Sequence, residues 1–414
     1  MKPKVSFKVA GQDLAGDRYR FCRRMLVGPW CNQPEEYEGY NGFVGWAGIT
    51  RLRSGRWLLT FTSGCWHVSI PWTEEIRKDP ASREQFEEWQ KIGLPNIRSP
   101  RGGRAHIMHS DDKGLTWSTP ETLVDSKHDD RSPTILELDD GTLLCTYFTY
   151  ALPCHVRSWH MRSTNVGTTW SKPQEFPGKS GGFGNGSAIQ LSDGTVLCTV
   201  GGKSEPGTGK ERLNICRSTD RGASFEIVSV IHDADVSSEA PIAELPDGRI
   251  VIISRRTSPI YFSEDGGRSW TEPAFIGVDL FDPHLVLTPG GVLACFHGSY
   301  KTGGLRVILS PDGGLTWYGP EEGLGYAVDT SVYGYSHQMV LPDGSIYCAY
   351  IHTGGHHAYD ARTEALWAIR LKVHPDAKGI DILPAPGCPA ERGDSLTTLE
   401  SMRTNGGDPE LGNL

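Results

Sequence analysis

The sequence lacks any apolar run that approaches the roughly 18 residues needed for a membrane-spanning helix. Its first residues, MKPKVSFKVAGQDLAGDRYRF, also lack the hydrophobic core of a secretory signal. These two absences predict no membrane partner and a cytoplasmic location. A secreted protein that has lost its leader is the alternative.

A stripe of basic residues is absent as well. The chain has 41 Lys and Arg against 50 Asp and Glu, its formal net charge is -9, and both signs are interspersed. Proteins that bind phosphate backbones concentrate positive charge on one face. Nucleic acid is therefore not an expected partner.

The cysteines lack the spacing of a metal site. Ten are scattered along the chain with no CxxC pair. Cys145, Cys198, Cys295 and Cys348 each fall inside an apolar strand pattern, which favours reduced core residues over disulfides or zinc ligands. No cofactor is expected.

One histidine-rich segment, HTGGHH, offers a metal alternative through His352, His356 and His357. A glycine-rich exposed loop explains the same three residues equally well. The sequence therefore predicts no functional metal, with this segment as the alternative.

Turn and strand residues are abundant. The 414 residues include 50 Gly and 27 Pro together with 12 Trp and 14 Tyr. Gly and Pro favour tight turns, and aromatic residues favour half-buried strand positions. The composition predicts an all-β fold. The domain count must come from repeats, because long β-rich folds often form one unit.

An eight-residue motif recurs five times at the spacing of one propeller blade. The starts of successive copies lie 53, 55, 45 and 47 residues apart. In each copy an Asp or Asn can bond its own backbone, a Gly can take a left-handed conformation and an aromatic residue can anchor the turn. The copies are SDDKGLTW from Ser110, STNVGTTW from Ser163, STDRGASF from Ser218, SEDGGRSW from Ser263 and SPDGGLTW from Ser310.

A second pattern, two apolar strands joined by a short turn, occurs six times in phase with the octets. Together the patterns predict one domain over residues 1–414, a six-bladed β-propeller with four-stranded antiparallel blades. The segment ALWAIRLKV is expected as an outer strand of blade six, and residues 22–32 as the strand that closes the ring. The six copies are ITRLRSGRWLLTFT, TILELDDGTLLCTYF, AIQLSDGTVLCTV, IAELPDGRIVIIS, LVLTPGGVLACF and MVLPDGSIYCAYI.

Two segments fall outside these patterns. Residues 66–103 form a charged insertion of helical composition in blade one, and such insertions commonly cover the mouth of a propeller site. The tail from about residue 375 is rich in Gly, Pro, Asp and Glu. It is expected to pack on the blades or to fray.

The residues that precede each inner strand should face one another across one funnel, because inner strands of a propeller converge on its axis. Any one of these residues alone is explained more simply as a turn or cap. Their convergence favours a site. They are Gly45 and Trp46; Asp130 and Arg131; Gly184 and Asn185; Ser238 and Glu239; Asp282 and His284; Tyr333, Tyr335 and His337.

The octets resemble the Asp-box, or BNR repeat, of the sialidase superfamily, which implies the fold and leaves the activity open. Two longer segments resemble sialidase sequences more closely. VYGYSHQMVLPDGSIYCAY is similar to the stretch with the nucleophilic tyrosine, which implies that role for Tyr335. SSEAPIAELPDGRIVIISRRT is similar to the stretch with the activating glutamate and a carboxylate-binding arginine, which implies Glu239 and Arg256.

The chemistry of the Tyr335 and Glu239 pair is consistent with that resemblance. A phenol with a pKa of about 10 is a poor nucleophile at neutral pH, and an adjacent carboxylate can accept its proton. In sialidases the tyrosine takes the place of the second carboxylate of other glycosidases. The alternative is that Tyr335 is only an aromatic residue of the inner wall.

The three arginines that bind a sialic acid carboxylate are mostly absent. Gly45 and Trp46 stand where the resemblance implies the first, Cys65 stands near the second, and only Lys301 and Arg306 lie near the third. Lys does not reproduce the bidentate bonds of Arg. We therefore expect a ligand other than sialic acid.

Aromatic residues and histidines occur in their place. Trp46, Trp66 and His67 lie in blade one, and Arg104 and His106 lie on the strand before the first octet. Aromatic rings stack on the apolar faces of sugars, and one Arg with several His suits a neutral or singly acidic sugar.

The acid of the reaction has three candidates, Asp130, Asp282 and His67. Asp130 is the first choice as acid/base, although an ion pair with Arg131 or a turn cap explains it as well. The residues assigned to substrate binding are Arg256, Trp46, His67, Arg104, Arg131, Asp282, His284, Tyr333 and His337.

These observations predict an exo-acting glycoside hydrolase that acts on a non-sialic or acidic sugar at an oligosaccharide end. A true exo-sialidase is one alternative. A polysaccharide lyase that uses His284, His337, Tyr335 and Arg256 on a uronate is another. The non-enzymatic alternative is a sugar-binding propeller. The sequence does not predict an oligomeric state.

Overall fold

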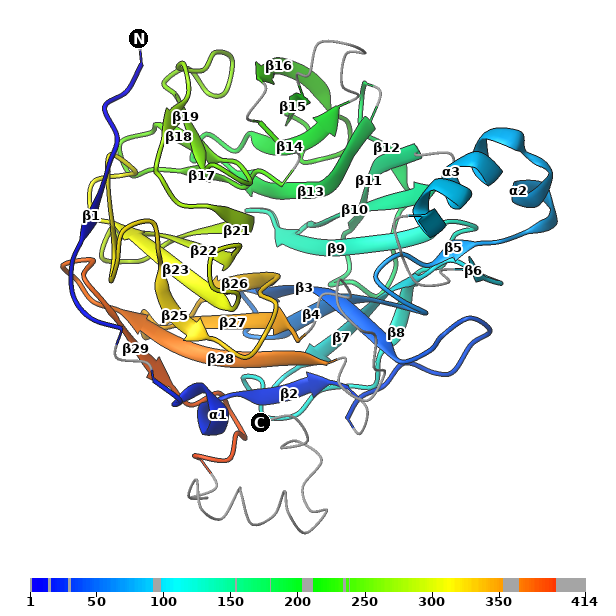
Figure 1. Ribbon diagram of the computed structural model, residues 1–414, viewed down its shortest axis with the longest axis horizontal. Helices are drawn as coiled ribbons and strands as arrows, with labels where there is room; N and C mark the ends of the chain where they lie inside the picture. Colours follow the sequence, from blue (N-terminus) through cyan, green and yellow to red (C-terminus); the bar gives the residue numbers. More distant parts are fainter. Residues whose placement is uncertain are drawn as a thin grey trace.

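The computed structural model describes residues 2–13, 16–28, 31–91, 98–152, 155–178, 180–202, 211–233, 236–237, 239–352 and 365–391. Six antiparallel sheets surround a central axis in the order in which the chain forms them (Figure 1). This arrangement is the six-bladed propeller that the repeats predict.

Blades one to three each have four strands in simple up-and-down order. Blade one contains β3 (Phe43–Arg51), β4 (Trp57–Gly64), β7 (Arg104–Ser110) and β8 (Glu121–Val124). Blade two contains β9 (Asp129–Glu137), β10 (Leu143–Ala151), β11 (His155–Ser163) and β12 (Gln174–Glu175). Blade three contains β13 (Ser180–Gln190), β14 (Val196–Gly202), β15 (Glu211–Ser218) and β16 (Glu226–Asp233).

Blade four has the same four-stranded order, whereas blades five and six contain additional strands, and β2 from the N-terminal part of the chain completes blade six. Blade four contains β17 (Ile242–Glu244), β18 (Ile250–Ile253), β19 (Pro259–Ser263) and β20 (Ala274–Phe275). Blade five contains β21 (Leu280–Leu287), β22 (Leu293–Ser299), β23 (Leu305–Ser310) and β24 (Thr316–Gly319), joined by β1 (Ser6–Val9) and β25 (Tyr326–Asp329). Blade six contains β26 (Ser336–Val340), β27 (Ile346–Ile351), β28 (Leu366–Val373), β2 (Arg24–Val27) and β29 (Ile380–Leu383).

Each octet connects the third strand of its blade to the segment leading to the fourth. In the first octet the Ser110 hydroxyl donates to Asp112 at 2.8 Å and accepts the Gly114 N–H at 2.9 Å. Asp112 in turn accepts the N–H and hydroxyl of Thr116 at 2.8 and 2.6 Å. The bonds from Thr116 lower the pKa of Asp112 to about 2. The octets therefore fix turns, and their carboxylates are already satisfied.

The ring is closed by β2, which pairs antiparallel with β28 and confirms the closing strand expected within residues 22–32. The register places Met25 opposite Trp367. Immediately before β2, the buried Arg23 donates to Asp329 at 2.8 Å. The loop after blade five is thereby tied to the closing strand.

Apolar side chains fill the space between blades. Cys145, Cys198, Cys295 and Cys348 are fully buried thiols, which confirms them as core residues. Burial raises the pKa of each of these thiols. They are therefore unreactive packing residues.

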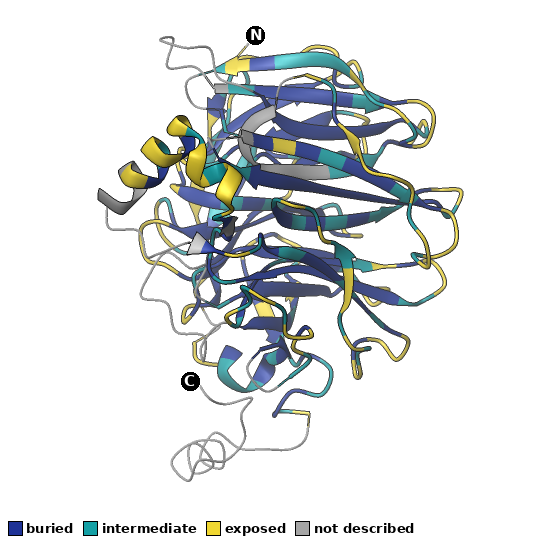
Figure 2. Ribbon diagram, turned by 90° about the vertical axis from the view of Figure 1, so that its right-hand side faces the viewer, coloured by how far each residue is buried: buried dark blue, intermediate teal, exposed yellow. Residues whose placement is uncertain are grey.

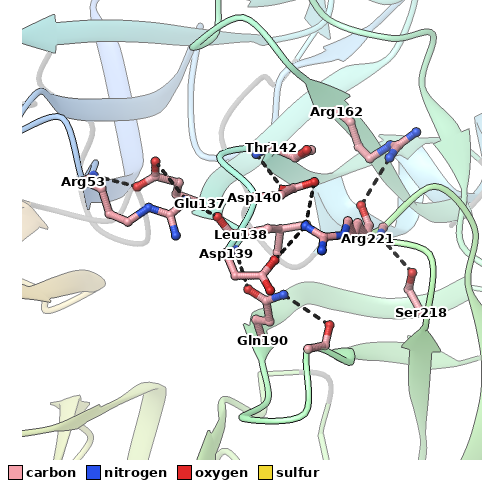
Figure 3. Close-up of polar contacts among 12 residues, drawn as sticks. Arg53, Glu137, Leu138, Asp139, Asp140, Thr142, Arg162, Gln190, Ser218 and Arg221 are labelled. Atoms are coloured by element: carbon pink, nitrogen blue, oxygen red, sulfur yellow. Dashed lines mark hydrogen bonds and ion pairs between the residues drawn. The ribbon is translucent and has the colours of Figure 1, made fainter.

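Polar side chains bridge successive blades at their hairpin turns (Figure 3). The backbone N–H of Arg53 in blade one donates to Glu137 in blade two at 2.7 Å. Arg221, from the octet of blade three, reaches Asp139 and Asp140 of blade two at 2.9 and 2.8 Å. An exposed ion pair contributes at most about 1 kcal/mol, so these bridges mainly orient neighbouring blades.

The insertion between β4 and β7 contains β5 (Ile70–Pro71), α2 (Glu74–Lys78), α3 (Pro80–Lys91) and β6 (Arg98–Ser99). Phe86 of α3 packs on Trp72 with ring centroids 4.5 Å apart. Figure 2 shows the two helices on one face of the ring. The only other helix among the described residues, α1 (Tyr19–Cys22), is one turn long, and none of these helices has the length and apolarity to cross a membrane.

Candidate functional site

Three inner strands bulge where their residues face the funnel. The register of β3, β9 and β21 shifts at this point. There Trp46, Ser132 and Asp282 adopt positive φ angles of 50°, 48° and 44°. Such angles are uncommon outside glycine, and bulges redirect side chains at functional sites. The bulges thus point the side chains of these residues toward the axis of the propeller, whereas a regular strand would point some of them away.

Tyr335 lies immediately before β26 and is buried among aromatic rings. Its ring centroid is 5.4 Å from that of Phe281, 5.6 Å from that of Tyr333 and 6.2 Å from that of Trp46. Burial, and then the charge of Glu239, raise the pKa of Tyr335 well above its ordinary value. At neutral pH the phenol is therefore protonated.

Glu239, just before β17, is held by two neighbours. One of its oxygens accepts from the guanidinium of Arg255, and the other accepts the Asp282 N–H at 2.8 Å. The Arg255 N–H also donates to the Glu239 carbonyl at 3.1 Å. The Glu239 side chain is 11% exposed and that of Arg255 is 24% exposed, so this ion pair lies at the boundary of the funnel.

Asp282 connects this pair to the tyrosine. Its carboxyl accepts the N–H of Ser336, the residue after Tyr335, at 3.1 Å. Burial, and then the charge of Glu239, raise the pKa of Asp282 well above its ordinary value. Blades four, five and six are therefore joined through Glu239, Asp282 and Ser336.

The arginine that contacts Glu239 is Arg255, and the arginine predicted from the sequence, Arg256, lies elsewhere. Arg256 is exposed, and its guanidinium carbon lies 5.4 Å from the centroid of the Tyr300 ring. Its φ of 75° interrupts the regular alternation of side chains, which is why the sequence did not distinguish the two arginines. Tyr300, which the sequence did not single out, also binds Arg255.

Blades one and two supply the opposite wall. The Arg131 guanidinium carbon lies 3.9 Å from the centroid of the Trp46 ring, and Arg131 donates to Asp129 at 3.3 Å. His67 packs on Trp46 with ring centroids 4.9 Å apart. Burial lowers the pKa of Arg131 and raises that of Asp129, and the attraction between the two opposes both shifts.

Asp130, the first choice for the acid, does not join this cluster. Its carboxyl accepts the N–H and the hydroxyl of Ser126 at 2.6 and 2.7 Å, as a turn cap does. Side chains alternate along β9, so Asp129 and Arg131 lie on one face and Asp130 on the other. Burial raises the pKa of Asp130 to about 7.

Arg104 is also separate from the tyrosine. Its guanidinium carbon lies 3.9 Å from the centroid of the Tyr37 ring, and it pairs with Asp125 at 3.2 Å. His106 bonds Ser63 at 2.7 Å in a buried position. These residues support the insertion side of blade one.

His284 and His337 form a half-buried pair, with ring centroids 4.1 Å apart. They line a cavity of about 330 Å³ on the propeller axis, to which the inner strands of all six blades contribute. Burial lowers the pKa of both histidines, that of His337 to about 4, and His337 accepts the N–H of Ile49 at 3.3 Å. Both rings are neutral and lie apart from the exposed Arg256.

Lys301 and Arg306, the basic residues that the sequence places near the third expected arginine, are bonded to other parts of the chain. Arg306 bonds Thr302 at 2.9 Å and the Gly325 carbonyl at 3.0 Å, and Lys301 bonds the Glu322 carbonyl at 3.1 Å. None of these bonds reaches the Tyr335 cluster.

Several predicted positions are not described. Ser238, His356 and His357 lie outside the described residues, as do the side chains of Gly184 and Asn185. Within the described part of the chain, no three His, Cys, Asp or Glu side chains are grouped to hold a metal ion.

Comparison with known proteins identifies the repeat and the fold. The BNR repeat-like domain family matches residues 103–285. A Dyadobacter fermentans protein of unknown function is similar over 85% of this chain and 98% of its own, with 17% identity and a TM-score of 0.65. No curated protein sequence matches the chain.

Two sialidases also share the fold. A Hadza microbial sialidase is 17% identical over 81% of this chain and 68% of its own, with a TM-score of 0.56. Trypanosoma rangeli sialidase is 15% identical over 84% of this chain, with a TM-score of 0.55, and the match spans 58% of its length. Identity at this level establishes the fold and not the activity. With five octets and six blades, the chain is a six-bladed β-propeller, and its residues 103–285 match the BNR repeat-like domain family.

Proposed function

We propose that the protein is an exo-acting glycoside hydrolase that removes a sugar other than sialic acid from the end of an oligosaccharide. The observation that carries this proposal is the position of Tyr335. It packs against Trp46 and lies in the electrostatic field of the Glu239 and Arg255 ion pair. A phenol beside a fixed carboxylate, under an aromatic wall, suits attack on a sugar ring.

In the proposed reaction, the Tyr335 oxygen attacks the anomeric carbon while Glu239 accepts the phenol proton. Each Glu239 oxygen accepts one bond, from Arg255 or from Asp282, and retains a lone pair for this proton. Because the pKa of Tyr335 is raised, proton transfer and bond formation should occur together. Water then attacks the anomeric carbon and gives its proton to the group that protonated the leaving oxygen in the first step. The bond to the Tyr335 oxygen breaks, and Glu239 returns its proton to the released phenolate.

The leaving oxygen must receive a proton from a second group. Asp130 faces away from the cluster, and Asp282 is enclosed beside Glu239. We assign this role to His67, which is half-buried on the Trp46 side of the funnel. An imidazole exchanges protons near neutral pH.

The geometry favours this reaction over the two enzymatic alternatives. A lyase would need the histidines and an arginine around one uronate, but His284 and His337 are half-buried on the axis while Arg256 lies at the rim. A sialidase would need free arginines, but Arg131 is paired with Asp129 and Arg255 with Glu239.

A panel of 4-nitrophenyl hexosides, uronides and a sialoside tests the proposal. The native protein should hydrolyse at least one hexoside or uronide, and Tyr335→Phe should reduce that rate by about 1000-fold or more. Tyr318→Phe, on the outer strand β24, is the matched control. Rapid sialoside cleavage, or full activity in Tyr335→Phe, would contradict the proposal.

Two further variants separate the assigned roles. His67→Gln should slow hydrolysis of methyl glycosides more than that of nitrophenyl glycosides, because a good leaving group needs no acid. Glu239→Gln should reduce turnover and retain binding. Binding without turnover by the native protein would instead support a sugar-binding propeller.

A further inference from the structure

The hydroxyl of Tyr300 occupies the fork of Arg255. The Arg255 Nε donates to this oxygen at 2.8 Å, and Nη2 donates to the same oxygen. The remaining nitrogen, Nη1, donates to Glu239. All three nitrogens of the guanidinium are therefore engaged by the protein itself.

The edge formed by Nε and Nη2 is one that binds a carboxylate or phosphate through two parallel bonds. Here a single neutral oxygen fills it. An incoming substrate anion would have to displace Tyr300 before it could use this edge. Arg255 thus offers an edge that could bind an anion, and the Tyr300 hydroxyl of the same protein occupies it.

Tyr300 is fixed by its surroundings and also open to the funnel. Its ring packs edge-on against Phe281, with centroids 4.9 Å apart, and its N–H donates to the Asp279 carbonyl at 3.4 Å. The residue is nevertheless 38% exposed, so a ligand can meet the ring. Among the described residues, the neighbouring Arg256 has no ion-pair partner and shares this rim.

We propose that Tyr300 is a specificity-determining residue, whose hydroxyl fills the anion subsite of Arg255 and so selects a sugar with an uncharged substituent there. The statement that Tyr300 occupies the subsite depends only on the contacts of Arg255. The statement about substrate rests on the proposed glycosidase activity. The two parts are therefore tested separately.

The first test measures the reactivity of Arg255 with phenylglyoxal, followed by peptide mass spectrometry on the full chain. Tyr300→Phe keeps the ring and removes only the hydroxyl. It should raise labelling of Arg255 relative to that of the exposed Arg256 on the order of tenfold. Acetate should protect Arg255 in this variant and not in the native protein. Tyr318→Phe should behave as the native protein does.

The second test compares aryl glycosides that differ only in a hydroxymethyl or a carboxylate group. Tyr300→Phe should raise the ratio of kcat/KM for the uronide over the hexoside by about tenfold, mainly through KM. If Tyr300 had only a structural role, its replacement would lower kcat/KM for both substrates by the same factor and leave this ratio unchanged.

The outcomes are decisive in both tests. Unchanged Arg255 labelling in Tyr300→Phe, or acetate protection already present in the native protein, overturns the occupied subsite. An unchanged uronide ratio overturns its role in specificity. If no glycoside is turned over, the proposed function fails, and the labelling result still decides whether Tyr300 occupies the subsite.

Discussion

Replacing Arg23 with Met tests how far closure of the ring depends on one buried ion pair. The side chains of Arg23 and Asp329 are 1% and 0% exposed, and their atoms approach to 2.8 Å. Asp329 also accepts from Tyr350 at 2.8 Å and from the Ser331 hydroxyl at 2.7 Å. The Arg23 guanidinium carbon lies 4.2 Å from the centroid of the Trp367 ring. The substitution therefore removes the cation that pairs with Asp329, while the carboxylate stays buried.

The expected cost follows from that burial. Removing one partner of a buried pair costs about 3–5 kcal/mol, because the other charge is uncompensated. The bonds from Tyr350 and Ser331 to Asp329 remain, so we expect about 3 kcal/mol. Unfolding entropy of about 2 cal/mol/K per residue then gives a decrease in Tm of about 3–4 °C for this chain.

Urea unfolding at pH 7, followed by tryptophan fluorescence, measures this loss in the free energy of unfolding. Arg56→Met is the control, because Arg56 pairs with Asp111 at 2.7 Å but the two side chains are 35% and 59% exposed. It should cost less than about 1 kcal/mol. Arg23→Met combined with Asp329→Asn should cost less than the sum of the single changes. The reasoning is refuted if Arg23→Met is no more costly than Arg56→Met.

Three other perturbations have defined outcomes. Asp130 has a pKa of about 7 in the fold against 3.8 otherwise, so its contribution to stability is present below about pH 4 and is lost as the pH rises to about 7. Urea unfolding of Asp130→Asn should therefore show a gain over the native protein that is larger at pH 8 than at pH 5 by about 3 kcal/mol, and an equal difference at both would contradict it. A Cβ at Gly298 would lie 2.1 Å from the Phe281 ring, so Gly298→Ala should push that ring toward Tyr335 and reduce kcat on the best aryl glycoside by about tenfold; unchanged kcat would count against it. Trp46→Ala should raise KM for that glycoside by about tenfold with a smaller effect on kcat, and the reverse split would argue against a stacking role.

The sequence predicted the architecture well because the octets repeat the same short-range interactions in successive blades. A bonded carboxylate or amide oxygen, a left-handed Gly and an aromatic anchor recur in every octet, and these interactions form within a few residues of one another. The Ser110, Asp112 and Thr116 contacts need no knowledge of the remaining chain. Closure by β2 was predictable because a propeller cannot leave an edge strand open.

Single positions in the site were harder to predict, because neighbouring strand residues face opposite sides. The sequence singled out Asp130 and Arg256, whereas the side chains that contact Arg131 and Glu239 belong to Asp129 and Arg255, one residue away in each case. A positive φ at Arg256 and the bulges in the inner strands change this alternation locally. No simple sequence pattern marks these angles in residues other than glycine.

Contacts between side chains on different blades could not be predicted from the sequence. The bond from Arg255 to Tyr300 joins residues 45 positions apart on different blades. Neither residue belongs to an octet or an inner hairpin, so no local pattern pairs them. Only the curvature of the ring brings them together.

The closing strand also has a mechanical consequence. Within the described chain, β2 continues toward β3, which carries Trp46, while β28 belongs to the sheet whose inner strand follows Tyr335. The pairing of β2 with β28 therefore holds the outer edge of the ring together. If the two strands separated, we expect Trp46 to move away from Tyr335. Because this coupling is reciprocal, a ligand that contacts both the Trp46 and Tyr335 rings should stabilise the pairing of β2 with β28. Its binding should slow hydrogen exchange at the β2 amides, on the far side of the blade from the ligand.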